Sequence, residues 1–292
     1  MITAVYVTFN PNLELLRESI DSIDTQINKI IIVDNSDTSN ISSFTHLYEN
    51  IELISIGNNI GIAAAQNIGI NRAISLGADY ILLSDQDTIY PKEFVKRMLP
   101  VFSLYQNVAA VVPKFIDFHK NKEDGFITKN LCFFKQVYFD KGTHEVFHAI
   151  ASGKIISCKV IKEIGGFDSN LFIDWVDFQW CWKARKKGFK IIANADVLIK
   201  HRLGDSSKNI FVKDINIRAP IRHYYITRNA FYLALRTEYL DIPHRLILFL
   251  KSFRYVIGYP LFLKPRLKNL RYVIIGMYHG IIGKIGKADF YE

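Results

Sequence analysis

The first hundred residues alternate short apolar runs with stretches of helical spacing, and this alternation restricts the fold more than any other feature. The apolar runs predict strands at residues 4–9, 29–33, 51–56 and 80–83. Apolar residues three or four apart predict a helix over 13–23, the stretch 61–76 predicts a second, and another is expected from about Pro91. Short, continuous apolar strands that alternate with helices indicate a parallel sheet buried on both faces.

The rest of the chain is less regular. Residues 108–160 are strand-like, residues 175–187 are expected to form a helix that ends at Gly188, and residues 190–195 are expected to form a further strand. After Pro220 the pattern predicts long amphipathic helices rich in aromatic residues and arginine. We therefore expect an α/β fold followed by a helical C-terminal region.

Positive charge is concentrated in the last third of the chain. The whole sequence has 37 Lys and Arg against 28 Asp and Glu, a net charge of +9, and residues 201–292 hold 16 of the basic and 6 of the acidic residues. This shift places a boundary near His201. Such a charge favours an anionic partner, which includes nucleotides, acidic lipids and nucleic acids.

The basic C-terminal helices suit an anionic bilayer surface, because cationic side chains alternate there with aromatic and aliphatic ones. These cationic residues are Arg245, Lys251, Arg254, Lys264, Arg266, Lys268 and Arg271. The alternative is a helical cap that packs its apolar side on the first domain. A nucleic-acid-binding protein is a competing class, but no recognition motif is present and the acids at the strand ends would need another reason.

Three further observations bear on location. The three cysteines are too few and too scattered for a disulfide framework or a cysteine-based zinc site. No window of about 18 uncharged apolar residues predicts a membrane-spanning helix. The N-terminus has no basic region before its first apolar run, so neither a secretory signal nor a transit peptide is expected. A cytosolic setting is the simplest interpretation.

Polar clusters follow three of the predicted strands, at Thr8-Phe9-Asn10, Asp34-Asn35-Ser36 and Asp85-Gln86-Asp87. Parallel strands bring such clusters to one edge of the sheet, where ligands bind in open α/β folds. Asp85 and Asp87 offer the hard oxygen ligands that Mg²⁺ or Mn²⁺ prefers, and a cation there would bridge to a phosphate. The alternative is a solvated turn. Asp34 is suited to a ribose hydroxyl or a base N–H, or to a simple Asx turn.

Two other segments and one histidine have both a functional and a structural interpretation. Small residues after Asn58-Asn59-Ile60-Gly61 allow close approach of a ligand to a helix N-terminus, or close packing of that helix on the sheet. Asp174 and Asp177 are three residues apart and are expected to share a helix face, as a general base and its neighbour or as first-turn acids. His201 is a candidate metal ligand or diphosphate contact, or a structural histidine.

The order and spacing of these segments resemble glycosyltransferase family 2, and within it the bacterial rhamnosyltransferases of O-antigen and polysaccharide assembly. The residues that carry the resemblance are Val7-Thr8-Phe9-Asn10, Val33-Asp34-Asn35-Ser36, Asn58 to Asn67, Ser84-Asp85-Gln86-Asp87, Gly165-Gly166-Phe167-Asp168, Asp174-Trp175-Val176-Asp177, His201 with Gly204, and Tyr225 with Arg228-Asn229. The chain departs from the family pattern at Val176 and Gln179, where many members have acids.

The resemblance implies a GT-A fold, which has a Rossmann-like nucleotide-binding half and a mixed central sheet. Residues 1–205 would form the catalytic domain, with a nucleotide-sugar half at 1–107 and an acceptor half at 108–205, and residues 206–292 the basic helical region. Asp177 would be the catalytic base and Mg²⁺ or Mn²⁺ the cofactor, held by Asp85, Asp87 and His201. The nucleotide sugar would be bound by Thr8, Asn10, Asp34, Asn35, Asn59, Gly61, Asn67 and Asp85, and Asp174, Trp175, Gln179 and Arg228 would lie on the acceptor side.

The implied reaction is the inverting transfer of a sugar, L-rhamnose from dTDP-β-L-rhamnose, to a hydroxyl of a lipid-linked oligosaccharide. UDP- and GDP-linked donors stay open as alternatives, as do a sugar-nucleotide binder without turnover and a non-enzyme that binds membrane or nucleic acid. The expected partners are the donor, the acceptor and an anionic surface on the inner face of the cytoplasmic membrane, with no nucleic acid; a homodimer is left open.

Overall fold

The strands of the N-terminal part line up in the order β3-β2-β1-β4, and all of them are parallel. The computed structural model describes residues 1–292 except 39, 118–121, 131–132, 202–205, 211–212 and 290–292. The elements of the N-terminal part are β1 (Ile2–Thr8), α1 (Leu13–Ile23), η1 (Asp24–Gln26), β2 (Lys29–Asp34), α2 (Ser42–Thr45), β3 (Ile51–Ser55), α3 (Ile62–Ser75), β4 (Tyr80–Asp85), α4 (Phe94–Met98) and α5 (Val101–Leu104).

The same sheet continues into the middle of the chain. The elements there are β5 (Val108–Asp117), β6 (Lys122–Asp124), β7 (Phe126–Asn130), β8 (Phe133–Val137), β9 (Thr143–Val146), β10 (Lys154–Ser157), α6 (Cys158–Ile164), η2 (Ser169–Leu171), α7 (Val176–Lys186) and β11 (Lys190–His201). Strand β10 pairs antiparallel with β4 and β5, β5 is parallel to β11, and β9 is antiparallel to β11. Within the described residues this gives one nine-stranded mixed sheet, so the predicted mixed central sheet is confirmed.

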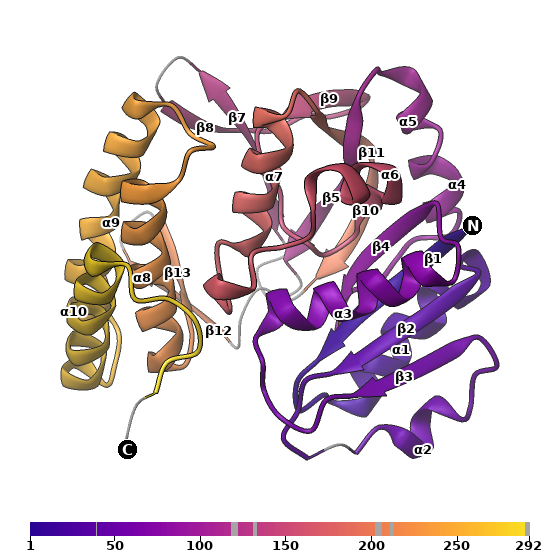
Figure 1. Ribbon diagram of the computed structural model, residues 1–292, viewed down its shortest axis with the longest axis horizontal. Coiled ribbons are helices and arrows are strands. Elements are labelled where there is room, and N and C mark those ends of the chain that lie inside the picture. The colour runs from indigo at the N-terminus through magenta and orange to yellow at the C-terminus, as the bar shows by residue number, and fades with distance from the viewer. Residues whose placement is uncertain (39, 118–121, 131–132, 202–205, 211–212, 290–292) are drawn as a thin grey trace.

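Helices cover both faces of this sheet (Figure 1). The strand residues Ala4, Ile31 and Leu83 are fully buried, as expected for strands that are covered on both sides. Helices α3, α6 and α7 contribute to the core on one face, and α1 and α4 to the core on the other. Gly69 of α3 allows this close packing, because a Cβ there would lie 2.4 Å from Cγ1 of Val5. The small residues of α3 therefore serve helix packing, which was one of the two interpretations.

Most predicted elements are present, and their boundaries differ for identifiable reasons. Strand β4 extends to Asp85 because Ser84 and Asp85 pair with Tyr6 and Val7 of β1. Strand β11 continues past Ala195 to His201, and its register against β5 shifts after Lys190 and again after Asn194. The helix expected from Pro91 begins only at Phe94, after Glu93 in a left-handed conformation.

The C-terminal region adds a hairpin of β12 (Ser206–Ile210) and β13 (Lys213–Ile217), then helices α8 (Pro220–Arg236), α9 (Ile242–Phe262) and α10 (Arg266–Ile282). These helices lie beside the sheet, at the left of Figure 1. Two glycines let α10 contact α8 closely, since a Cβ at Gly276 would lie 2.6 Å from the Tyr224 carbonyl oxygen and one at Gly280 2.4 Å from that of Arg228. None of the described helices has the length and apolar character needed to span a membrane.

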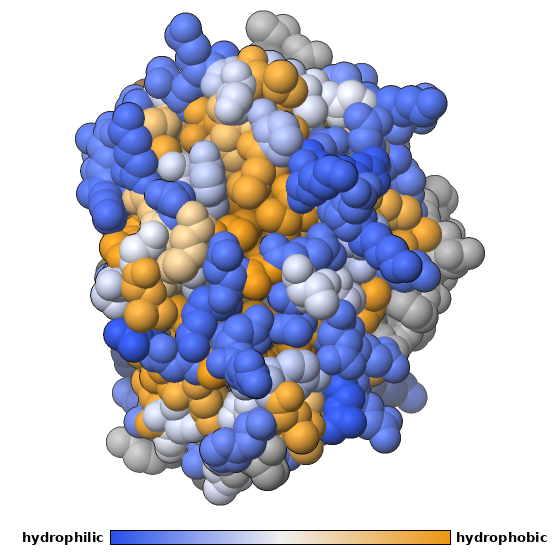
Figure 2. All heavy atoms as spheres, turned by 90° about the vertical axis from the view of Figure 1, so that its right-hand side faces the viewer, coloured by the Kyte–Doolittle hydropathy of each residue, from blue (hydrophilic) through white to orange (hydrophobic). Residues whose placement is uncertain are grey.

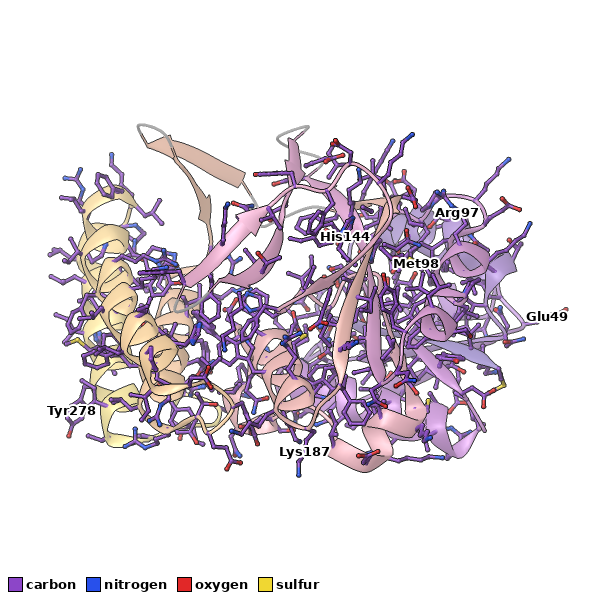
Figure 3. The ribbon with its side chains drawn as sticks, turned by 90° about the horizontal axis from the view of Figure 1, so that it is seen from above. Glu49, Arg97, Met98, His144, Lys187 and Tyr278 are labelled. Carbon is purple, nitrogen blue, oxygen red and sulfur yellow. The ribbon has the colours of Figure 1, made fainter. Side chains whose placement is uncertain are left out.

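The long axis of the molecule runs from the strands of the N-terminal part to the C-terminal helices. Tyr278 on α10 and Glu49 before β3 lie at opposite ends when it is seen from above (Figure 3). The face on the side of α4 and α5, opposite the C-terminal helices, carries hydrophilic side chains interspersed with apolar ones (Figure 2).

Candidate active site

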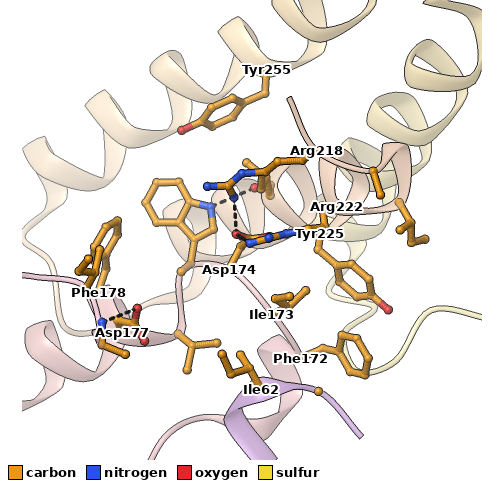
Figure 4. A pocket seen from close by; sticks show the side chains of 18 of the residues that line it. Ile62, Phe172, Ile173, Asp174, Asp177, Phe178, Arg218, Arg222, Tyr225 and Tyr255 are labelled. Atoms are coloured by element: carbon orange, nitrogen blue, oxygen red, sulfur yellow. Dashed lines mark hydrogen bonds and ion pairs between the residues drawn. The ribbon is translucent and has the colours of Figure 1, made fainter. Parts of the chain in front are cut away.

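The carboxyl ends of β1, β2 and β4 meet at one edge of the sheet, as predicted. The Cα of Thr8 pairs with that of Asp34, and the Cα of Val7 pairs with that of Asp85, so the end of β1 lies between the two acids. A cavity of about 1610 Å³ opens at this edge. It extends past the N-terminus of α7 to helices α8 and α9 (Figure 4).

The end of β2 forms a hydrogen-bonded polar cluster. Oδ1 of the buried Asp34 accepts hydrogen bonds from the hydroxyls of Thr8, at 3.0 Å, and Ser36, at 2.7 Å. The Asn35 side chain donates to Oδ1 of Asn59 at 3.1 Å. Asn35 and Asn59 line the cavity, and Thr8 and Asp34 are not among the lining residues. Asn10 is exposed near them, and its backbone N–H donates to the Ser36 hydroxyl.

Gly61 and Asn67 of the segment 58–67 make structural contacts. Gly61 lines the cavity in a left-handed conformation, and a Cβ there would lie 2.6 Å from Cδ2 of Phe172. Asn67 does not line the cavity: its Nδ2 donates to the Phe167 carbonyl at 2.8 Å, and its Oδ1 accepts from the Phe167 N–H at 2.9 Å. Asn67 thus fastens α3 to Phe167 and does not lie in the cavity lining, where its predicted contact with the nucleotide sugar would be made. Contact of Gly61 with the nucleotide sugar stays a prediction.

Three acids line the cavity near the end of β4. They are Asp85, the last residue of β4, Asp87 after it, and Asp177 in the first turn of α7. Oδ2 of Asp177 accepts the Ala151 N–H at 3.0 Å, and Oδ2 of Asp85 accepts the hydroxyl of the next residue, Ser152. The segment before β10 therefore holds the two carboxylates in one site.

The pKa of Asp177 is raised to about 6: burial is the largest cause and the neighbouring charge of Asp85 adds to it, whereas the ammonium of Lys154 and the Ala151 N–H act in the opposite direction. Lys154 is fully buried on β10, where its Nζ donates to the Ala149 carbonyl at 2.9 Å. A carboxyl group with a pKa near 6 is ionised at neutral pH and is still basic enough to accept a proton from a hydroxyl group.

The expectation that Asp174 and Asp177 share a helix face is wrong. Helix α7 begins at Val176, and Asp174 lies before it with a φ of 62°. Its carboxylate faces away from α7, toward two guanidinium groups: Oδ1 accepts from Nη1 of Arg218 and from Nη2 of Arg222, both at 2.7 Å. These arginines hold the pKa of Asp174 below its usual value although burial raises it.

The segment that carries Asp174 is strained and is held by α8. Phe172, Asp174 and Trp175 all have positive φ, a conformation that bulky residues rarely adopt and that is concentrated at functional sites. Nδ2 of the buried Asn229 donates to the carbonyls of Leu171, Ile173 and Asp174 at 2.9 to 3.0 Å. Asn229 thus holds this loop against α8.

The remaining predicted residues are placed as follows. Trp175 lines the cavity, and its Nε1 donates to the Ile226 carbonyl. Gln179 and Arg228 are buried and do not line the cavity; Arg228 donates to the carbonyls of Leu171 and Gly286. The His201 side chain and Gly204 lie outside the described residues. Among those that are described, no group of three His, Cys, Asp or Glu is placed to hold a metal ion.

Sequence reasoning missed four residues of the site: Ser152, Lys154, Arg218 and Arg222. A signal existed for one of them. Lys154 begins a strand and is followed by Ile155 and Ile156, so its neighbours suggested a buried role. Arg218 lies before α8 and Arg222 in its first turn, so the helix rule for residues four apart does not bring this pair together. Ser152 has no sequence signal that separates it from a surface serine.

The chain is similar to known proteins in sequence and in fold. Residues 3–165, more than half of the chain, match the sequence profile of Glycosyl transferase family 2. The chain belongs to this family. It is 34% identical over 249 residues to the dTDP-rhamnosyl transferase RfbF of Shigella flexneri, which covers 82% of each protein. The predicted family and the predicted glycosyltransferase class are confirmed.

Solved structures show the same fold at low sequence identity. S. aureus TarS 1–349 in complex with UDP-GlcNAc superposes with a TM-score of 0.61 at 16% identity, over 96% of this chain and 82% of that one. GalNAc-T7 with UDP, GalNAc and Mn²⁺ superposes with a TM-score of 0.60 at 13% identity and covers 89% of this chain. This chain spans 57% of the GalNAc-T7 chain.

Proposed function

We propose that this family 2 enzyme transfers L-rhamnose from dTDP-β-L-rhamnose to a hydroxyl of a lipid-linked oligosaccharide, with inversion at the anomeric carbon. The sugar and the nucleotide follow from the similarity to the protein named dTDP-rhamnosyl transferase. The observation that carries the proposal is the arrangement of Asp85 and Asp177 in one cavity, held by Ser152 and Ala151.

Asp85 and Asp87 fit a divalent cation. Both are hard oxygen donors that line the cavity, and Mg²⁺ is commonly held by one or two carboxylates together with substrate phosphates and water. When bound, the cation supplies Lewis-acid stabilisation of the diphosphate leaving group. A His201 contribution stays a prediction, as does the choice between Mg²⁺ and Mn²⁺.

The chain's own groups supply the other steps. Asn35 and Asn59 line the end of the cavity at β2, where they are positioned for the nucleoside, with Asp34 behind them. The Asp177 carboxylate takes the proton of the acceptor hydroxyl as that oxygen attacks the anomeric carbon from the face opposite the leaving group. The Ala151 N–H fixes the orientation of this base through its 3.0 Å hydrogen bond to Oδ2. One displacement converts a β-linked donor into an α-linked product.

We further infer that the enzyme works on the inner face of the cytoplasmic membrane, docked through α9 and α10. Both helices keep apolar side chains exposed after packing: Ile242, Leu246, Leu250, Ile257 and Leu261 on α9 are 54 to 78% exposed, and Leu267, Leu270, Ile274, Tyr278 and Ile281 on α10 are 39 to 82% exposed. Residues 242–282 include seven Lys and Arg and no acid. A helical cap alone leaves these residues unexplained, whereas an anionic bilayer complements both the apolar surface and the charge.

A donor panel tests the reaction. The full-length protein is incubated with dTDP-, UDP- and GDP-sugars in the presence of Mg²⁺, Mn²⁺ or EDTA, and thermal shift and transfer are measured. We expect a stabilising shift and transfer with dTDP-β-L-rhamnose and a divalent cation, and an α-linkage by nuclear magnetic resonance. Transfer from another nucleotide sugar alone would show that the proposed donor is wrong. Undiminished transfer in EDTA would show that the reaction does not need the proposed cation.

Sedimentation with vesicles tests the location. We expect binding to phosphatidylglycerol vesicles at low salt, and less binding after Leu250→Ser and Ile257→Ser. Leu47→Ser and Leu104→Ser are matched controls, since these leucines are 63% and 65% exposed on other elements. Equal sedimentation of both pairs, or no binding by the wild type, would reject the docking surface.

A further inference from the structure

The charge in the cavity is separated between its two ends. Asp85, Asp87 and Asp177 lie on the sheet side, whereas the described lining residues from α9, from the first turn of α8 and from the segment just before it include four cations, Arg218, Arg222, Lys251 and Arg254. Of the four acids in the described lining, Asp174 is the one at this end, where it contacts Arg218 and Arg222, so cations outnumber acids in this part of the lining. We call it the cationic wall.

Asp174 holds the two arginines of the wall side by side. Arg222 contacts it with two nitrogens, Nη2 at 2.7 Å and Nε at 3.3 Å, and Arg218 contacts it with Nη1 at 2.7 Å. In Figure 4 the carboxylate lies between the two guanidinium groups. One carboxylate shared by two guanidinium groups holds both of them in place at the cavity.

The other two cations, Lys251 and Arg254, are carried by α9, and Arg254 lies beside an aromatic ring. Arg254 lies 5.1 Å from the ring centroid of Tyr255 and donates to its hydroxyl at 3.1 Å, and Tyr255 stacks on Tyr259 at 5.5 Å. Lys251, Tyr255 and Tyr259 line the cavity. A wall of cations and aromatic rings suits a ligand in which a phosphate group adjoins an apolar chain.

Helix α9 also has a second face with a different character. Lys251, Tyr255 and Tyr259 recur every four residues toward the cavity, and Leu246, Leu250 and Ile257 are exposed on the outside. The helix that we assign to the bilayer surface thus carries the cationic wall on its inner side. A lipid held in the bilayer at this helix would reach the cavity with its headgroup first.

We propose that Arg218, Arg222, Lys251 and Arg254 form a subsite for the diphosphate that joins the carrier lipid to the acceptor sugar. This inference rests on the proposed transfer to a lipid-linked acceptor and adds the group by which the acceptor is recognised. The donor nucleotide contains a diphosphate too, so the shared chemistry is a diphosphate monoester or diester and the test must separate the two sources. The donor's diphosphate belongs with Asp85 and Asp87 at the opposite end.

Calorimetry with farnesyl diphosphate, a short lipid diphosphate, and with dTDP separates these sources. The double variant Lys251→Gln, Arg254→Gln removes two cations of the wall; Lys159→Gln, Lys187→Gln removes two exposed cations that do not line the cavity. We expect wild type and control to bind farnesyl diphosphate equally, and the wall variant to bind it at least about tenfold more weakly, because hydrogen bonds to charged groups contribute that much. Binding of dTDP should change less than twofold, and farnesol should not compete.

The proposal is overturned if farnesyl diphosphate does not bind the wild type, if the control loses as much affinity as the wall variant, or if the wall variant loses dTDP binding instead. Equal unfolding midpoints confirm that both variants fold. The donor panel above is an independent test of the reaction. If the donor panel shows no transfer but farnesyl diphosphate binds as expected, only the proposed reaction is rejected. If the donor panel shows transfer but farnesyl diphosphate does not bind as expected, only the subsite is rejected.

Discussion

Asp85 and Asp177 are held by two consecutive residues: the Ser152 hydroxyl donates to Asp85 and the Ala151 N–H donates to Asp177 at 3.0 Å. The two carboxylates belong to different elements, the end of β4 and the first turn of α7. The short segment before β10 thus fixes the candidate donor side of the site relative to the candidate base. This arrangement makes specific predictions.

Ser152→Ala removes the hydroxyl that orients Asp85. A hydrogen bond to a charged group contributes about 1.5–3 kcal/mol, so we expect a loss of about tenfold or more in kcat/KM. The loss should be accompanied by a higher cation concentration for half-maximal activity. Steady-state kinetics at varied Mn²⁺ measures both. Ser103→Ala, at an exposed serine of α5, is the control, and equal kinetics for both variants would contradict the role of Ser152.

The pH profile should report Asp177. With a pKa of about 6 in the folded protein, the base loses activity as the pH falls through 6. Lys154 lowers this pKa, so Lys154→Met should move the acid limb of kcat/KM to higher pH. The raised pKa also makes the free energy of unfolding depend on pH. The contribution of Asp177 to stability is complete below the pKa of the unfolded state, about 4, and is lost as the pH rises through about 6. An acid limb that does not move in Lys154→Met would reject this coupling.

Asn229→Ala should release the loop that carries Asp174 and Trp175. Its side chain is fully buried and donates to three carbonyls of that loop, so the variant leaves buried acceptors without a donor, at a cost of about 1–3 kcal/mol each. We expect a lower urea midpoint and weaker acceptor binding. Asn40→Ala, at an exposed asparagine, should change neither, and an unchanged midpoint for Asn229→Ala would contradict the account.

Two glycines of the C-terminal helices should respond oppositely to alanine. At Gly276 a Cβ would lie 2.6 Å from a backbone oxygen of α8, and at Gly258 it would meet nothing within 4 Å. Gly276→Ala should therefore destabilise the protein by about 1–3 kcal/mol through overpacking. Gly258→Ala should stabilise it by about 0.5–1 kcal/mol, since alanine favours the helix. Urea unfolding measures both, and the same sign for both would contradict the described α8–α10 contact.

The sequence predicted the strands β1 to β4 and their polar ends because local patterns determine both. Apolar runs specify buried strands, and parallel pairing then brings Thr8, Asp34 and Asp85 to one edge. The roles of Asn67 and Asp174 could not be predicted in the same way. Each depends on a contact with a distant segment: Asn67 binds Phe167, and Asp174 binds Arg218 and Arg222. The left-handed conformation of Trp175, which moves the start of α7 to Val176, likewise depends on tertiary contacts.

The most direct test of the central claim compares Asp177→Asn with Asp196→Asn, at an exposed aspartate, in binding and in turnover. Calorimetry gives the affinity for dTDP-β-L-rhamnose with Mn²⁺, and transfer to a lipid-linked acceptor gives kcat. If Asp177 is the base, Asp177→Asn binds the donor within about threefold of the wild type and loses at least about 100-fold in kcat, while Asp196→Asn changes neither. Near-normal turnover by Asp177→Asn would contradict the claim.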